Sequence, residues 1–202
     1  MAIKVDSSIM LDTFGILRNN VSCILFIVLK LNSYKDEYGI PVVNINLKDL
    51  NKKTNITPAK IKTAIKRLIA KKIIIKKSKE IYYIPTEIDY CNKLRTIRRE
   101  KFYTRGAVFR INKKFFYKFI KAIDNNYLVF KIYYFLLLVT QHDIWFNTEQ
   151  VRSKVKLTAI VKLARVWCNE TIFYEILNIL TDLGLIVIDQ KYKIHTIKNF
   201  VV

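Results

Sequence analysis

The chain has 202 residues, of which 51% are hydrophobic, and its formal net charge at pH 7 is +20. This amount of apolar material excludes global disorder, and only four glycines and three prolines favour a compact, mainly helical protein. The positive charge points to a polyanionic partner, and it is uneven: residues 15–90 carry +9, residues 91–122 carry +10 and residues 123–202 carry +2.

The first half of the chain predicts the order helix, strand, helix, helix, hairpin. An apolar helix over residues 22–35 is followed by a short β-type piece at 41–45 and an amphipathic helix capped by Asn46. Thr57 is the expected cap of the next helix, with Pro58 at its first position. The apolar stripe of that helix comprises Ile61, Ile65, Leu68 and Ile69. Two β-type runs around residues 77–79 then predict a hairpin.

The second half repeats this order. We expect a buried helix over 127–139, a β-type piece with a helix capped by Asn147 over 144–156, a capped helix over 169–184 and a hairpin over 185–197. About eleven extra residues within 156–168 predict an additional short helix. An offset of 112 residues places Thr57 on Asn169, Ile61 on Phe173, Ile65 on Leu177, Leu68 on Leu180 and Ile73 on Leu185.

This element order resembles tandem winged-helix proteins, in particular plasmid and phage replication initiators and two-domain transcription regulators. The resemblance covers roughly residues 15–200 and implies a mainly α fold with small β-hairpins (α+β). It divides the chain into an N-terminal winged helix at 15–90, a basic helical linker at 91–110 and a C-terminal winged helix at 111–202. In such families the third helix enters the major groove and the hairpin touches the backbone or minor groove. The resemblance assigns those roles to residues 58–72 and 76–79.

The residues themselves also indicate a DNA-binding surface in the first half. No carboxylate occurs from Pro58 to Lys79, although like charges on one helix repel unless an outside anion neutralises them. At 100° per residue, Ala59, Thr63, Lys66 and Ala70 point away from the apolar stripe. The predicted DNA contacts here are Lys60, Lys62, Thr63, Lys66, Arg67, Lys76, Lys77 and Lys79. A solvated lysine-rich face is the alternative.

The middle segment and the second half offer further candidates. Arg95, Arg98 and Arg99 would share one helical face and suit phosphate or a narrow minor groove. The aromatic side chains between residues 115 and 119 could stack on single-stranded bases, but helix-spaced aromatics are more often core. The second half also contains three candidate DNA contacts, Arg152, Lys154 and Lys162. Its capped helix instead exposes Glu170, Glu175 and Asp182, which favour a homodimer or a protein partner through residues 123–202.

Several other classes of site lack the residues they need. Three cysteines far apart and two isolated histidines show no metal-ligand spacing, so we expect reduced thiols, no metal and no cofactor. The most apolar stretch is too short to span a bilayer and is interrupted by Lys131. We therefore expect no membrane partner and no signal peptide, and a cytoplasmic protein associated with DNA or the nucleoid.

Two functions remain open, and neither is enzymatic. A tyrosine nuclease would need a metal site or an Arg/His cluster, and nucleotide hydrolysis would need a Gly-rich phosphate loop. We expect sequence-specific binding of double-stranded DNA, in replication initiation or transcription regulation of a mobile element or virus. The alternative is an RNA-binding or nucleoprotein-assembly module that makes protein contacts through the second winged helix.

Overall fold

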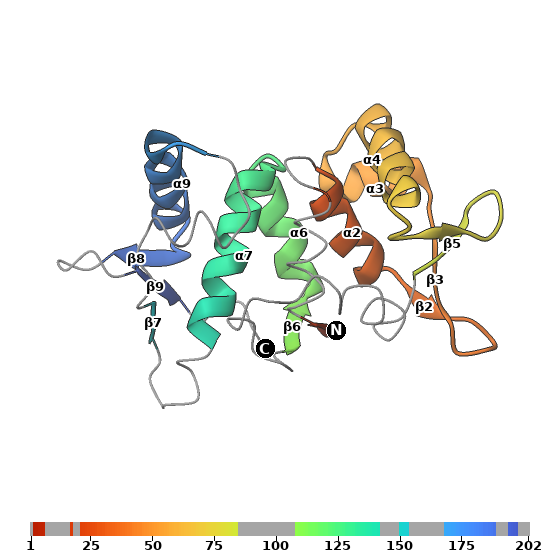
Figure 1. Cartoon of the computed structure of the whole chain (residues 1–202), viewed down its shortest axis with the longest axis horizontal. Coiled ribbons are helices and arrows are strands. Elements are labelled where there is room, and N and C mark those ends of the chain that lie inside the picture. Colours follow the sequence, from red (N-terminus) through yellow and green to blue (C-terminus); the bar gives the residue numbers. More distant parts are fainter. Residues whose placement is uncertain are drawn as a thin grey trace.

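The computed structural model describes residues 2–6, 17, 21–84, 108–141, 150–153, 168–188 and 194–197. Within them the protein is a mixed α+β structure of six helices and three small antiparallel sheets. Figure 1 shows an elongated molecule with helices α4 (Pro58–Ala70) and α9 (Glu170–Asp182) near its two ends. Helices α2 (Ser22–Leu31), α6 (Lys113–Ala122) and α7 (Tyr127–Gln141) lie between them.

The first half is built around α2, whose residues from Ser22 to Leu29 are all buried. Its other elements are β2 (Tyr34–Lys35), β3 (Pro41–Asn44), α3 (Leu47–Thr54), α4, β4 (Ile75–Lys76) and β5 (Ile81–Tyr83). The strands form one sheet in the order β2-β3-β5-β4, in which Val43 lies opposite Tyr82. The predicted helices, the strand at Pro41 and the hairpin are therefore confirmed, except that the first helix ends at Leu31. The prediction of helix is wrong at Tyr34 and Lys35, which form strand β2 and pair with β3.

The second half contains α6, α7, β7 (Gln150–Ser153), α9, β8 (Ile186–Ile188) and β9 (Ile194–Ile197). Its sheet has the order β7-β9-β8, the counterpart of β3-β5-β4. The predicted helix after Asn147 is wrong at residues 150–153, because this segment is extended and pairs with β9. Asn147 and the predicted extra helix within 156–168 lie outside the described residues, apart from Cys168 at its end.

The repeat at an offset of 112 residues is confirmed in α4 and α9. Both helices have 13 residues, and the side chains of Thr57 and Asn169 cap them. The backbone conformation after each helix also repeats, since Lys72 and Gly184 both have positive φ, 56° and 66°. The buried positions are equivalent: Ile61, Ala64, Ile65, Leu68 and Ile73 correspond to Phe173, Ile176, Leu177, Leu180 and Leu185.

One continuous cluster of buried side chains runs through both halves. Three side-chain hydrogen bonds also join them: Asn32 Nδ2 to Tyr117 Oη at 2.6 Å, Lys121 Nζ to the Lys52 carbonyl at 3.2 Å and Asn125 Nδ2 to the Thr54 carbonyl at 2.9 Å. A further strand pair, not predicted, joins β1 (Ala2–Asp6) to β6 (Val108–Asn112). The predicted helical linker is therefore wrong at residues 108–110, which are extended, and β6 crosses the expected boundary between residues 110 and 111.

The aromatic side chains of α6 belong to this core. Phe116 and Phe119 are buried, and Phe115 and Tyr117 pack partly buried against the cluster. Phe119 lies 4.9 Å from Tyr133 of α7, measured between ring centroids. The core interpretation is confirmed for Phe116 and Phe119, whose burial leaves no ring face to stack on bases. The expectation of a buried helix over 127–139 is confirmed from Val129 to Tyr134 and at Leu136, and includes the fully buried Lys131.

Candidate nucleic-acid interface

Helix α4 is held with one face outward by its cap and its core contacts. The Thr57 hydroxyl accepts a hydrogen bond from the Lys60 amide at 3.4 Å, and Pro58 occupies the first turn, where a missing N–H costs nothing. Ile61, Ala64 and Leu68 anchor the inner face with almost no exposed surface. Burial of these side chains fixes the rotation of the helix, so the outward residues are determined by the same pattern.

The outward face of α4 is cationic with small residues at its centre. Ala59, Thr63, Lys66 and Ala70 are all exposed, as the sequence predicts, and the flanking Lys60, Lys62 and Arg67 are exposed as well. Thr63 donates its hydroxyl to the Ala59 carbonyl at 3.1 Å, which keeps that side chain close to the backbone. A surface of this kind can approach a polyanion closely and bring several positive charges to it.

The β4–β5 connection extends the cationic surface but also brings a carboxylate to it. Lys76, Lys77 and Lys79 are exposed. Lys77 Nζ donates to Asp36 Oδ2 of the β2–β3 connection at 2.9 Å. This hydrogen bond lowers the pKa of Asp36 below its usual value and raises the pKa of Lys77. The charge of Lys77 is thus partly compensated inside the protein, a contact that the sequence did not reveal.

A groove of about 740 Å³ runs along one side of α4. The helix contributes Lys60, Thr63 and Arg67 to it. The opposite wall is the turn between α6 and α7, where Asp124 and Asn125 both have positive φ. The groove therefore combines two cations with amide and carboxylate groups from the second half of the chain.

The turn residues Asp124, Asn125 and Asn126 are groove residues that sequence reasoning missed. Asn125 is fixed by its hydrogen bond to the Thr54 carbonyl, and Asn126 caps α7 by accepting from the amides of Leu128 and Val129. In the sequence, these three residues predict only a connection between two helices. Its place beside α4 depends on the packing of α6 against α3, which no local pattern contains.

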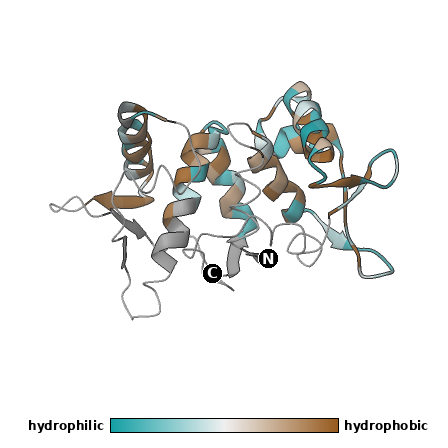
Figure 2. Cartoon of the chain, viewed as in Figure 1, coloured by the Kyte–Doolittle hydropathy of each residue, from teal (hydrophilic) through white to brown (hydrophobic). Residues whose placement is uncertain are grey.

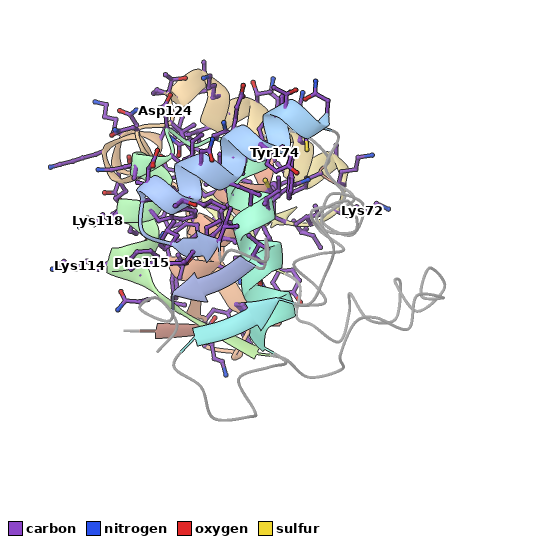
Figure 3. The ribbon with its side chains drawn as sticks, turned by 90° about the vertical axis from the view of Figure 1, so that its left-hand side faces the viewer. Lys72, Lys114, Phe115, Lys118, Asp124 and Tyr174 are labelled. Atoms are coloured by element: carbon purple, nitrogen blue, oxygen red, sulfur yellow. The ribbon has the colours of Figure 1, made fainter. Side chains whose placement is uncertain are left out.

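Helix α6 presents a separate set of cations. Lys114, Lys118 and Lys121 are exposed. Figure 3 shows Lys114 and Lys118 projecting on one side of the molecule and Lys72, which follows α4, on the opposite side. These α6 lysines have the same charge and a similar exposed helical setting as the α4 cations but belong to a different helix.

Several predicted contacts are not brought together by the described structure. Arg95, Arg98, Arg99, Lys154 and Lys162 lie outside the described residues. Arg152 lies in β7, where its backbone is opposite His195 of β9, and its side chain is not described. The contacts expected of these six residues stay predictions.

Helix α9 lies where α4 lies in the first half but has a different surface. Glu175 and Asp182 are exposed, as predicted, and so are Thr171, Tyr174 and Asn178. No lysine or arginine occurs between residues 168 and 188. The two equivalent helices thus present surfaces of opposite charge.

In the part of the chain that the structure describes, no helix has the length and hydropathy to cross a bilayer, and no group of three or more His, Cys, Asp or Glu could hold a metal ion. No model of a known protein family matches this chain, and neither a curated protein nor a solved structure matches it.

Proposed function

We propose that this protein binds double-stranded DNA through α4 and the β4–β5 hairpin, in the manner of a winged helix. The observation that carries the proposal is the outward face of α4, where the exposed residues Lys60, Lys62, Lys66 and Arg67 surround small side chains and no carboxylate occurs from Pro58 to Lys79. DNA phosphates would neutralise this charge, and the release of their counterions would drive binding.

The arrangement of the first half supports the winged-helix assignment. Helix α2 is followed by strands β2 and β3, helices α3 and α4 and the β4–β5 hairpin, and β3 pairs with β5. In this arrangement α4 would enter the major groove, which is about 12 Å wide and admits a helix. Lys60 and Thr63 would contact base edges, while Lys66, Arg67, Lys76 and Lys79 would contact phosphates.

The order α7, β7, α9, β8, β9 in the second half supports a tandem arrangement, although no counterpart of α3 lies among the described residues. The whole protein would then act in replication initiation or transcription regulation of a mobile element or virus, associated with DNA in the cytoplasm or nucleoid. The first half would hold the DNA, and residues 123–202 would make a homodimer or bind a protein partner. The acidic outer face of α9 supports this division, because phosphate repels Glu175 and Asp182.

The test is a salt titration of the full chain against a duplex DNA, one of its single strands and an RNA duplex of the same sequence. We expect the DNA duplex to bind most tightly, because the deep, narrow major groove of A-form RNA does not admit a side-chain-bearing helix. Selection from a random duplex library should then enrich a defined site. Equal or tighter binding of the RNA duplex would favour the RNA-binding alternative instead.

A further inference from the structure

The exposed surface of α9 differs from that of α4 in a systematic way. At the 112-residue offset, three exposed cations of α4 are replaced by apolar residues of α9: Lys60 by Ile172, Lys62 by Tyr174 and Arg67 by Ile179. Lys71 directly after α4 corresponds to Leu183 directly after α9, and Lys66 corresponds to the polar Asn178. The following strand continues the trend, since Lys76 corresponds to Ile188. The inner faces of the two helices bury equivalent positions, so only the surface has changed.

These apolar side chains are not part of the core. Tyr174 is 44% exposed, and Ile172, Ile179, Leu183, Val187 and Ile188 are exposed to between 36% and 43%. Figure 2 shows β8 in hydrophobic colours and a mixture of hydrophobic and hydrophilic residues on both α9 and α4. Figure 3 shows Tyr174 on α9, the helix nearest the viewer at this end of the molecule. A cluster of this kind, at an end of an otherwise strongly charged protein, is typical of a protein contact.

Three of these residues form a seam along the helix. Ile172, Ile179 and Leu183 are spaced by seven and then four residues, which places them on one side of α9. At a rise of 1.5 Å per residue the seam is about 16 Å long, or three helical turns. A seam of this length matches one amphipathic helix lying along α9.

Charge decides which occupant fits the seam. Glu175 and Asp182 are exposed on α9, and no cation occurs between residues 168 and 188. Both carboxylates lie on one flank of the seam, so in an antiparallel two-fold contact between two copies of α9 they would face each other and repel. A helix with an apolar stripe flanked by Lys or Arg would instead pair with them.

We propose that the seam on α9, formed by Ile172, Ile179 and Leu183, is a docking site for a basic amphipathic helix of another protein. The apolar stripe of that helix covers the seam, and its cations pair with Glu175 and Asp182. This interaction does not depend on DNA binding by α4. It gives the second half of the chain a partner of defined chemistry.

The test uses two designed helical peptides of about 20 residues with the same Leu and Ile stripe. One carries Lys and the other Glu on both flanks of the stripe. The comparison is discriminating because the protein has a net charge of +20, so non-specific attraction favours the Glu peptide. In fluorescence anisotropy at about 0.15 M salt, where long-range attraction is screened, we expect the full chain to bind the Lys peptide at least about fivefold more tightly.

Two variants connect binding to the seam. Ile172→Ser together with Ile179→Ser should weaken binding of the Lys peptide by about tenfold or more, because two apolar contacts are lost. Glu175→Lys together with Asp182→Lys should reverse the preference between the peptides. These side chains are exposed, so both variants should keep the circular dichroism spectrum of the unmodified chain.

Three results would overturn the proposal. Neither peptide binds, the Glu peptide binds more tightly to the unmodified chain, or the Ile variant binds the Lys peptide as the unmodified chain does. A fourth result would also overturn it. If sedimentation shows that the unmodified chain is a dimer and the Ile variant a monomer, the seam is covered by a second copy of this chain.

Discussion

Arg67 of α4 and Ile179 of α9 occupy the same position in two capped helices of 13 residues, and both side chains are exposed. The backbone and the buried residues around them are equivalent, whereas the surface is cationic in one helix and apolar with carboxylates in the other. The same local scaffold can therefore serve two kinds of partner. The solvent-facing positions decide which partner it takes, because the buried ones are fixed by the core.

The first prediction concerns the two caps. Thr57→Ala and Asn169→Ala each remove a side chain that accepts from a backbone amide, which costs about 0.5–2 kcal/mol of stability. The Asn169 bond is shorter, 2.9 Å against 3.4 Å, so Asn169→Ala should cost more. Urea unfolding measures both, with Thr57→Ser as the control that retains an acceptor. An equal or larger loss for Thr57→Ala would contradict the ranking.

The second prediction concerns the buried lysine of α7. Lys131 has no exposed surface, and burial lowers the pKa of its ammonium group. Lys131→Met should raise the free energy of unfolding at pH 7 by about 1–3 kcal/mol, since the unfolded chain solvates the charge better than the core does.

The stability difference between the Met variant and the unmodified chain should depend on pH. The folded protein binds fewer protons at Lys131 than the unfolded chain, so the penalty falls as pH rises from the lowered pKa towards 10.5. The advantage of the Met variant should therefore be smaller at pH 10 than at pH 7. Burial raises the pKa of Cys23 to about 11 and the charge of Lys131 lowers it, so the Met variant raises the pKa of Cys23 further, which reduces the advantage at pH 10 in the same direction. A Met variant that is less stable at pH 7 would show that contacts of the amine outweigh its desolvation.

The sequence predicts α4 well because the signals that define this helix lie within the helix itself. Thr57, Pro58 and the stripe through Ile61 and Leu68 lie within one helix, so its bounds and its outward face could be read directly. The spacing of the apolar residues along a helix determines which of its side chains are buried and which are exposed. The capped helix α9 was predictable for the same reason.

Features that depend on distant parts of the chain were not predictable. The segment at 150–153 was expected to be helical, yet its pairing with β9, more than 40 residues later, overrides local preference. The pairing of β1 with β6, the ion pair of Asp36 with Lys77 and the groove beside Asn125 likewise join residues far apart in the sequence. No spacing or composition signal encodes such contacts.

The third prediction uses the ion pair of Lys77. Asp36→Asn removes the carboxylate that partly compensates this lysine, so affinity for duplex DNA should rise. The slope of log affinity against log salt should steepen by up to about 0.9. Asp182→Asn, the same change on α9, is the control and should leave the slope unchanged. If the two variants behave alike, only the net charge matters and the hairpin does not contact DNA.

The fourth prediction separates two roles of Asn125, which has a φ of 56° and donates to the Thr54 carbonyl. Asn125→Gly removes the hydrogen bond but tolerates the conformation, and should cost about 1 kcal/mol. Asn125→Ala also strains the backbone and should cost about 1 kcal/mol more. Thermal unfolding of both variants measures the difference. Equal losses would mean that the positive φ is relieved in the Ala variant.

The central claim, that α4 holds the DNA, is tested most directly by one comparison of matched variants. Lys66→Ala with Arg67→Ala removes two cations from α4, and Lys114→Ala with Lys118→Ala removes two from the exposed face of α6. All four side chains are exposed, so both proteins should fold normally. The measurement is the duplex-DNA affinity of each full-length variant between about 0.05 and 0.2 M salt. The account predicts that the α4 variant binds more weakly, with a salt slope shallower by about 1.8, while the α6 variant matches the unmodified chain. Equal slopes for all three proteins, or a loss confined to the α6 variant, would contradict it.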